Sequence, residues 1–281
     1  MQTIYSLAFD LFPGSPPKHT IQMPYDYIFR GIVMRWIAEV NRSLGNELHK
    51  TDQKGGKKTI RKYSIYHKFN AAITNNANTK PNSAGGVRFI LNIFSGEMID
   101  ALIDYVMKKN TSTVQLGPQK CIISKIEVKQ IDPHEIVRSA QPLNRIELMF
   151  RSPTAFKQMG TNKYLFTPVA EKIYGNLAKQ WNNLYEDTSF PCPDDFYDWV
   201  VGNVHVQKTD LSIRSWKMGK GKHRFKGFKG WVLMDISDDD GKMSEWVHIL
   251  SKFGELSNTG SGRTAGFGHF DIVNLIPIKT H

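Results

Sequence analysis

The sequence has few cysteines and no long apolar run, and both absences narrow the class of protein. The two cysteines, Cys121 and Cys192, lie far apart and lack the paired spacing of a zinc site. They favour a reducing compartment and argue against a structural metal. No stretch approaches the roughly 20 apolar residues that span a bilayer, and the first residues lack a basic region followed by an apolar run. We therefore expect a cytoplasmic protein that is not exported, has no membrane contact and needs no cofactor.

Acidic residues are missing from residues 211–231, although the chain as a whole carries a net charge of +11. This segment is interleaved with aromatic side chains and predicts a hairpin whose lysines follow phosphates while an aromatic ring stacks on a base. A solvated basic face with aromatic residues in the core is the alternative. RNA contact is expected from Arg214, Lys217, Lys222, Arg224, Lys226 and Lys229, and from Lys57 and Lys58 in a second basic cluster near residues 54–68.

The first half of the chain reads as a strand, a helix, two strands, a helix and a strand. Apolar residues alternate over residues 5–11, as in a strand with one buried face, and recur at helical spacing from Phe29 to Leu44 after Pro24. Strands are predicted at 63–69 and 87–94, a helix at 97–109 and strand at 112–128. This β-α-β-β-α-β order is the ferredoxin-like, or RRM-like, pattern.

The second half repeats that order. The expected elements are strands at 145–150, 199–213, 225–236 and 267–276, with helices at 169–185 and 246–256. Pro133 and Pro142 interrupt the pattern between the halves. We therefore predict an α+β protein of two tandem ferredoxin-like domains, over residues 1–135 and 136–281.

A glycine-rich segment, Asn258 to Gly268, lies between the last predicted helix and strand. Glycine lets a backbone approach a phosphate closely, and Arg263 offers a charged fork, so phosphate contact is expected from Gly260, Gly262, Arg263, Gly266 and Gly268. A flexible turn is the alternative. The segment lacks the Gly-Lys-Ser/Thr ending of a P-loop, and its position after a helix excludes a Rossmann fingerprint.

The second half resembles the RAMP superfamily of CRISPR proteins and, within it, the Cas-six family of repeat-cleaving endoribonucleases. The resemblance is carried by residues 150–156, by Thr167 and Pro168 leading into a helix that ends Gln180-Trp181-Asn182, and by the glycine-rich segment itself. It covers most of residues 144–281, and the first half more loosely.

That resemblance implies a metal-independent endoribonuclease that cuts precursor CRISPR RNA within its repeats. The 2′-hydroxyl beside the scissile phosphate attacks it and leaves a 2′,3′-cyclic phosphate and a 5′-hydroxyl. Such chemistry needs a base, an acid and cations near the phosphate. The mature guide RNA is expected to stay bound, an effector complex is a candidate partner, and the protein is expected to be a prokaryotic monomer or homodimer.

The family places a histidine after its first helix, ahead of a Lys-Pro-Phe-Ser/Thr strand. The corresponding residues are Leu48-His49 and then Arg61-Lys62-Tyr63-Ser64-Ile65. The resemblance therefore implies His49 as the general acid or base. Lys62 replaces the family's proline, so either Arg61 or Lys62 is the transition-state cation.

Other residues compete for a place in the site. The resemblance implies that Tyr27 and Arg30 of the first helix contribute to it, and His67 lies on a predicted strand in the same region. His223 and His269 are expected to contact RNA or to lie on the surface. The competing function is a non-catalytic RAMP subunit that holds guide RNA. A general RNA chaperone or tRNA-modifying enzyme would leave the segments at 152–156 and 181–182 unexplained.

Overall fold

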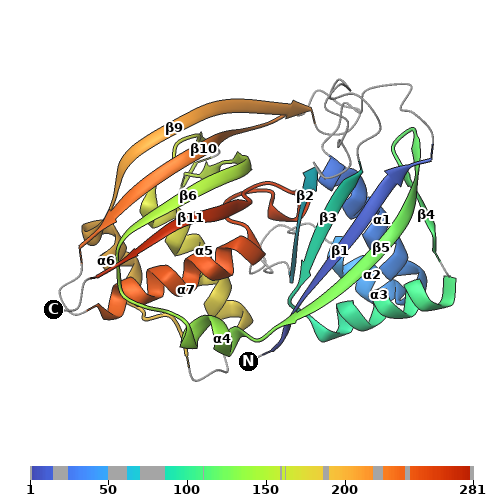
Figure 1. Ribbon diagram of the computed structural model, residues 1–281, viewed down its shortest axis with the longest axis horizontal. Helices are drawn as coiled ribbons and strands as arrows, with labels where there is room; N and C mark the ends of the chain where they lie inside the picture. Colours follow the sequence, from blue (N-terminus) through green and yellow to red (C-terminus); the bar gives the residue numbers. More distant parts are fainter. Residues whose placement is uncertain are drawn as a thin grey trace, which may run out of the picture.

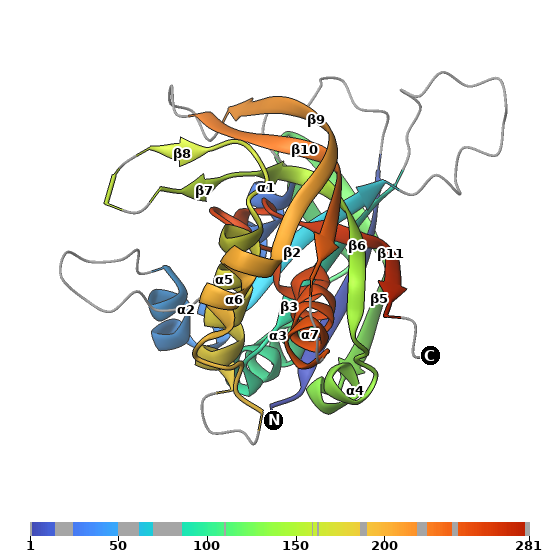
Figure 2. The same cartoon turned by 90° about the vertical axis from the view of Figure 1, so that its left-hand side faces the viewer.

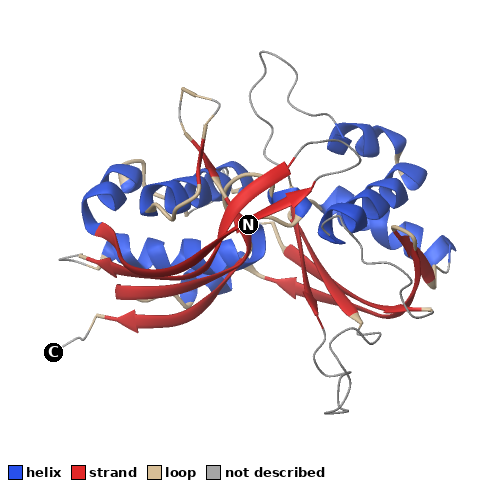
Figure 3. Cartoon of the chain, turned by 90° about the horizontal axis from the view of Figure 1, so that it is seen from above, coloured by secondary structure: helices blue, strands red, loops and turns tan. Residues whose placement is uncertain are grey.

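The computed structural model describes most of the chain. The described residues are 2–14, 25–49, 62–69, 86–109, 111–158, 160–161, 163–185, 190–217, 224–237 and 241–278. They form two antiparallel sheets that lie side by side (Figure 1). The helices cover one side of both sheets, as Figure 3 shows from above. The predicted α+β class is confirmed.

The first sheet has the order β2-β3-β1-β5-β4. Its strands are β1 (Ile4–Pro13), β2 (Tyr63–Phe69), β3 (Val87–Ile93), β4 (Thr113–Leu116) and β5 (Gln119–Ile131). Its helices are α1 (Tyr25–Val40), α2 (Arg42–His49) and α3 (Gly96–Lys109). The expected helix at 29–44 is interrupted at Asn41, whose side chain accepts a hydrogen bond from the backbone N–H of Leu44 at 3.0 Å.

The second sheet has the order β11-β6-β10-β9. Its strands are β6 (Leu143–Thr154), β9 (Val204–Lys217), β10 (Arg224–Ile236) and β11 (Phe270–Pro277). Its helices are α5 (Ala170–Leu184), α6 (Phe196–Asn203) and α7 (Lys242–Ser257). A short hairpin, β7 (Phe156–Lys157) with β8 (Tyr164–Leu165), projects beside it (Figure 2).

Other segments also differ from the expected elements. The single strand expected at 112–128 is a hairpin of two strands, β4 and β5. The strand predicted at 199–213 is wrong at its start, because Phe196 and Val200 are buried one helical turn apart and residues 196–203 form α6. Between the halves lies the helix α4 (Pro133–Arg138), which the sequence analysis missed. Pro133 opens this helix and Asp132 caps it through the backbone N–H of His134 at 2.9 Å. The predicted boundary at 135/136 falls inside α4.

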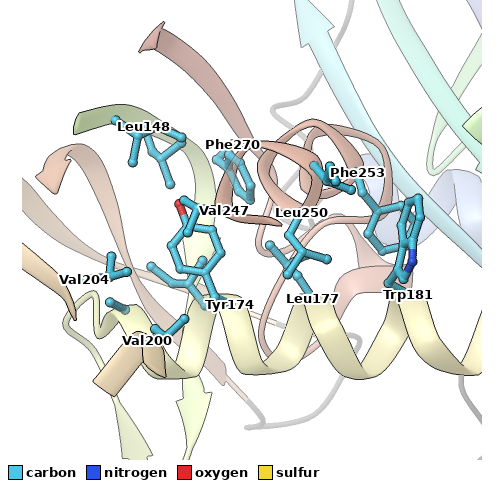
Figure 4. Close-up of a cluster of buried hydrophobic side chains, with 14 of the residues drawn as sticks. Leu148, Tyr174, Leu177, Trp181, Val200, Val204, Val247, Leu250, Phe253 and Phe270 are labelled. Atoms are coloured by element: carbon cyan, nitrogen blue, oxygen red, sulfur yellow. The ribbon is translucent and has the colours of Figure 1, made fainter. Parts of the chain in front are cut away.

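Each sheet has its own apolar core on the helix side. In the second half, the α5 residues Tyr174, Leu177 and Trp181 point into a cluster with Phe253 of α7 and Phe270 of β11 (Figure 4). Trp181 is fully buried, with its ring centroid 5.4 Å from that of Phe253. Burial of large aromatic side chains of this kind dominates core stability. The two sheets therefore form a well-packed framework that positions the residues between them.

Polar contacts join the free edge of β2 to the end of α7. Asn258 Nδ2 donates to the carbonyl of Ile65 at 3.1 Å, and Asn92 Nδ2 donates to the carbonyl of Leu256 at 2.6 Å. Ser64 Oγ also donates to the Leu256 carbonyl. The bond to Ile65 satisfies one backbone carbonyl of the exposed edge, and all three bonds hold the two halves together.

Candidate RNA-cleaving and RNA-binding site

Two side-chain pairs connect α1 to β2. Arg30 Nε donates to the Tyr63 hydroxyl at 2.9 Å, and His67 Nδ1 lies 2.7 Å from Asp26 Oδ2. Asp26 and Arg30 are one helical turn apart, while Tyr63 and His67 are four residues apart and so share a face of the strand. The two pairs consequently lie on the same interface between helix and strand, four residues apart along β2.

The glycine-rich segment packs directly on this pair of elements. Gly266 has a φ of +87°, and a Cβ at that position would lie 2.3 to 2.4 Å from Cβ, Cγ and Oδ2 of Asp26. Gly268 has a φ of +77°, and its Cβ would lie 1.7 Å from the carbonyl oxygen of Thr259. Both positions therefore need glycine for close packing and for a left-handed backbone. The glycines bring the second half of the chain against the start of α1.

Several N–H groups of the segment bond within the protein. Gly260 N donates to Asn176 Oδ1 at 3.0 Å, and Gly268 N donates to the carbonyl of Pro153 at 3.1 Å. Gly266 N donates to the carbonyl of Arg263 at 3.3 Å. These groups hold the shape of the loop. Gly262 is exposed. Contact between phosphate and the glycines of this segment stays a prediction.

Arg263 is turned toward α5 and α7. Its Nη1 donates to Gln180 Oε1 and, at 3.2 Å, to the carbonyl of Ser257. Burial lowers the pKa of Arg263 to about 10. Gln180 also donates to the carbonyl of Asn258 at 3.3 Å. The motif residues of α5 thus position the glycine-rich segment, which gives them a structural role within the fold.

The basic hairpin is formed by β9 and β10. Arg214 pairs with Gly227, and Trp216 pairs with Phe225. The Phe225 ring stacks on Phe267 of the glycine-rich segment, with centroids 3.8 Å apart and an interplanar angle of 5°. Trp216 retains 37% of its surface exposed. The hairpin is therefore tied to the glycine-rich segment and presents an aromatic ring to solvent.

Basic side chains gather where β6, β9 and β10 run together. Burial lowers the pKa of Lys229, and the charges of Arg214 and Arg151 lower it further. Arg214 is exposed, and Arg151 Nε donates to Asp271 Oδ2 at 2.7 Å. Mutual repulsion among these cations is relieved by an anion, so the cluster is suited to a phosphate. Arg224 and Lys226 are also exposed, and Lys226 Nζ lies 5.0 Å from the Phe166 ring centroid.

Of the remaining predicted residues, the structure describes the positions of His49, Lys62 and Tyr27 in the first half. His49 is the last residue of α2, and Lys62 is exposed immediately before β2. Tyr27 is half-buried on α1. Arg61, Lys57, Lys58, Lys222 and His223 lie outside the described residues, and Lys217 is placed only as the end of β9.

Two residues, His269 and Asp26, have contacts that the sequence does not predict. His269 is buried, and its ring stacks on Tyr66 with centroids 3.6 Å apart, so the expectation of an exposed residue is wrong. Asp26 was not singled out, because an acid in the first turn of a helix is usually explained by the helix dipole. Its partner His67 lies 41 residues away, and no local pattern links the two.

Neither a metal centre nor a membrane span is found in the part of the chain that the structure describes. No group of three or more His, Cys, Asp or Glu side chains there could hold a metal ion. No helix there is long and apolar enough to cross a membrane. Cys121 and Cys192 are both buried and free.

Comparison with known proteins finds a family that the second half of this chain matches. Residues 148–270 match the model of the family described as CRISPR-associated endoribonuclease Cas6. This confirms the resemblance to the Cas-six family. No curated protein matches the sequence.

Solved structures show the same fold over nearly the whole chain. A Cas6 of Thermus thermophilus, solved as a product complex, has a TM-score of 0.74 at 16% identity, covering 97% of this chain and 100% of that one. A second Cas6 product complex has a TM-score of 0.70 at 14% identity, with coverages of 97% and 100%. A Cas6-related protein of Pyrococcus furiosus has a TM-score of 0.55 at 12% identity, with coverages of 96% and 98%.

Proposed function

We propose that this chain, whose residues 148–270 match the Cas6 family, is a metal-independent endoribonuclease that cleaves precursor CRISPR RNA within its repeats. The 2′-hydroxyl attacks the adjacent phosphorus, the bond to the 5′-oxygen breaks, and the products carry a 2′,3′-cyclic phosphate and a 5′-hydroxyl. Proton transfer by positioned side chains contributes about 10²- to 10⁴-fold to such reactions. The mature guide RNA stays bound after cleavage.

The observation that carries this proposal is the meeting of Arg30 with the start of β2. Arg30 Nε donates to the Tyr63 hydroxyl, and Lys62 directly precedes Tyr63 in the chain, so two of the cations proposed for the site belong to the two segments that meet at the start of β2. Cations at that place would stabilise the charge that builds on the phosphate in the transition state. Arg30 and either Arg61 or Lys62 are assigned to this role, Tyr27 is proposed to contribute to the same site, and His49 is assigned to proton transfer.

RNA would reach the site over basic surfaces of both halves. Arg214, Lys229 and Arg151 form a cationic cluster on the second sheet, and the exposed Trp216 offers a ring for base stacking. Gly262 is exposed in the glycine-rich segment beside α1. A substrate held across these surfaces would contact both halves.

The order of the strands supports two tandem ferredoxin-like domains. In each sheet the first strand in sequence lies centrally, beside the third and fourth β-strands of the β-α-β-β-α-β order, with β4 an additional edge strand in the first sheet. We place the division between them at 135/136. Short α4 would then be the connection.

One experiment tests the activity. The protein is incubated with a CRISPR repeat RNA in EDTA, together with His49→Ala and, as a matched control, His205→Ala at an exposed site on β9. We expect cleavage by the wild type and by His205→Ala, and binding without cleavage by His49→Ala. Binding without cleavage by every protein would favour a non-catalytic RAMP subunit, and an active His49→Ala would move proton transfer to another residue.

A further inference from the structure

The proposed reaction needs two proton transfers, one from the attacking 2′-hydroxyl and one to the departing 5′-oxygen. His49 accounts for only one of them. Histidine changes protonation near neutral pH, which makes it the usual residue for either transfer. Among the described histidines, His248 and His269 are buried at 4% and 2% exposure. His67 lies on β2, the strand that also carries Tyr63, and its side chain retains 22% exposure.

The side chain that pairs with His67 is the carboxylate of Asp26, which is buried and contacts neighbouring residues. Asp26 is 5% exposed, its Oδ2 lies 2.7 Å from His67 Nδ1, and Gly266 packs against it. Within the described part of the chain, the other oxygen, Oδ1, is buried without a hydrogen-bond partner. A buried carboxylate is costly unless it is paired, so His67 is the contact that offsets its burial.

The pairing determines how the imidazole can act. When Nδ1–H donates to Asp26, the ring is held in one orientation and in the tautomer whose Nε2 accepts a proton. A carboxylate in this position also stabilises the imidazolium that forms after proton transfer, as in hydrolytic triads. The Asp26 carboxylate would therefore orient His67 for proton transfer through Nε2.

We propose that His67 Nε2 accepts the 2′-hydroxyl proton and that Asp26 is its positioning residue. This inference rests on the proposed function. As the proton moves to Nε2, the 2′-oxygen forms its bond to phosphorus, the phosphorus–5′-oxygen bond breaks, and His49 supplies a proton to the 5′-oxygen. Arg30, one helical turn from Asp26, would lie next to the phosphate during this step.

A substrate with sulfur in place of the bridging 5′-oxygen separates the two roles, because a thiolate leaves without a proton. Single-turnover cleavage of the oxygen and sulfur substrates is measured for the wild type, His49→Gln, His67→Gln and Asp26→Asn. His205→Gln is the matched control. Glutamine at 67 keeps a donor for Asp26, and thermal unfolding and affinity for 2′-deoxy repeat RNA report whether each variant stays folded and binds.

We expect His67→Gln to slow cleavage of both substrates by about 100-fold or more, the size of a lost proton-transfer group. We expect His49→Gln to be slow on the oxygen substrate and to match the wild type on the sulfur substrate. Asp26→Asn should lower the rate at saturating RNA, on both substrates, without weakening RNA binding.

Two results would overturn the assignment. Cleavage by His67→Gln at the wild-type rate would remove His67 from the reaction. Recovery of His67→Gln on the sulfur substrate would make it the acid and not the base. If the wild type cleaves neither substrate, the proposed function itself fails, which is a different outcome from either of these.

Discussion

Replacement of Gly266 by alanine should destabilise the protein because of one contact between the halves. A left-handed backbone costs alanine about 1 kcal/mol, and the φ at this position is +87°. The new Cβ would also lie 2.3 to 2.4 Å from three atoms of Asp26, so α1 or the loop must move. Overpacking of this kind costs about 1–3 kcal/mol. We therefore expect a total loss of about 2–4 kcal/mol in unfolding free energy.

Gly160 offers a matched control for the backbone contribution. Its φ is +71°, and a Cβ there meets nothing within 4 Å. Gly160→Ala should therefore cost about 1 kcal/mol. At roughly 2 °C per kcal/mol for a chain of this size, the Tm should fall by roughly 4–8 °C in Gly266→Ala and about 2 °C in Gly160→Ala.

Differential scanning calorimetry measures the loss of stability in the two variants, and in Gly266→Ala made in an Asp26→Gly background. Removing the Asp26 side chain removes its clash with the added methyl group, so the cost of Gly266→Ala should fall to the backbone contribution. Equal Tm values for Gly266→Ala and Gly160→Ala would show that the contact with Asp26 adds nothing to the backbone cost. So would an undiminished cost in the Asp26→Gly background.

Three further predictions concern the core, the pH dependence and the RNA surface. Trp181→Ala should lower the unfolding free energy by about 3–5 kcal/mol in urea titrations, because the ring is fully buried. Burial lowers the pKa of His248 by more than its hydrogen bond to Gln141 raises it. The unfolded chain therefore binds more protons, and stability present above about pH 6.5 should decline as the pH falls below it, a decline that His248→Gln reduces. Arg214→Ala and Lys229→Ala should each weaken RNA binding for every sequence tested and reduce the slope of log affinity against log salt by about 1.

Much of the secondary structure could be predicted because its signals are local. The strand at 63–69 matches β2 at both ends, and the helix at 97–109 matches α3 to within one residue. Apolar periodicity and flanking turn residues carry this information within a few residues. The helix α6 was missed because the apolar residues of 199–213 run from a helix into a strand without a break.

The candidate site was only partly predictable because it depends on contacts between distant segments. Arg30 and Lys62 could be proposed from the sequence, but the bond from Arg30 to Tyr63 depends on how α1 packs on β2. The pairing of Asp26 with His67 follows from the same packing. Gly266 was expected to face phosphate, and its contact with Asp26 arises only when the second half docks on the first.

Cleavage of repeat RNA by its own 2′-hydroxyl requires that hydroxyl and leaves defined product ends. The wild-type protein is incubated in EDTA with a repeat RNA and with the same RNA bearing a single 2′-deoxy nucleotide before the cut, and the product ends are identified by mass spectrometry. We predict a 2′,3′-cyclic phosphate and a 5′-hydroxyl from the first RNA and no cleavage of the second. Cleavage of the deoxy substrate at the same bond would contradict the account.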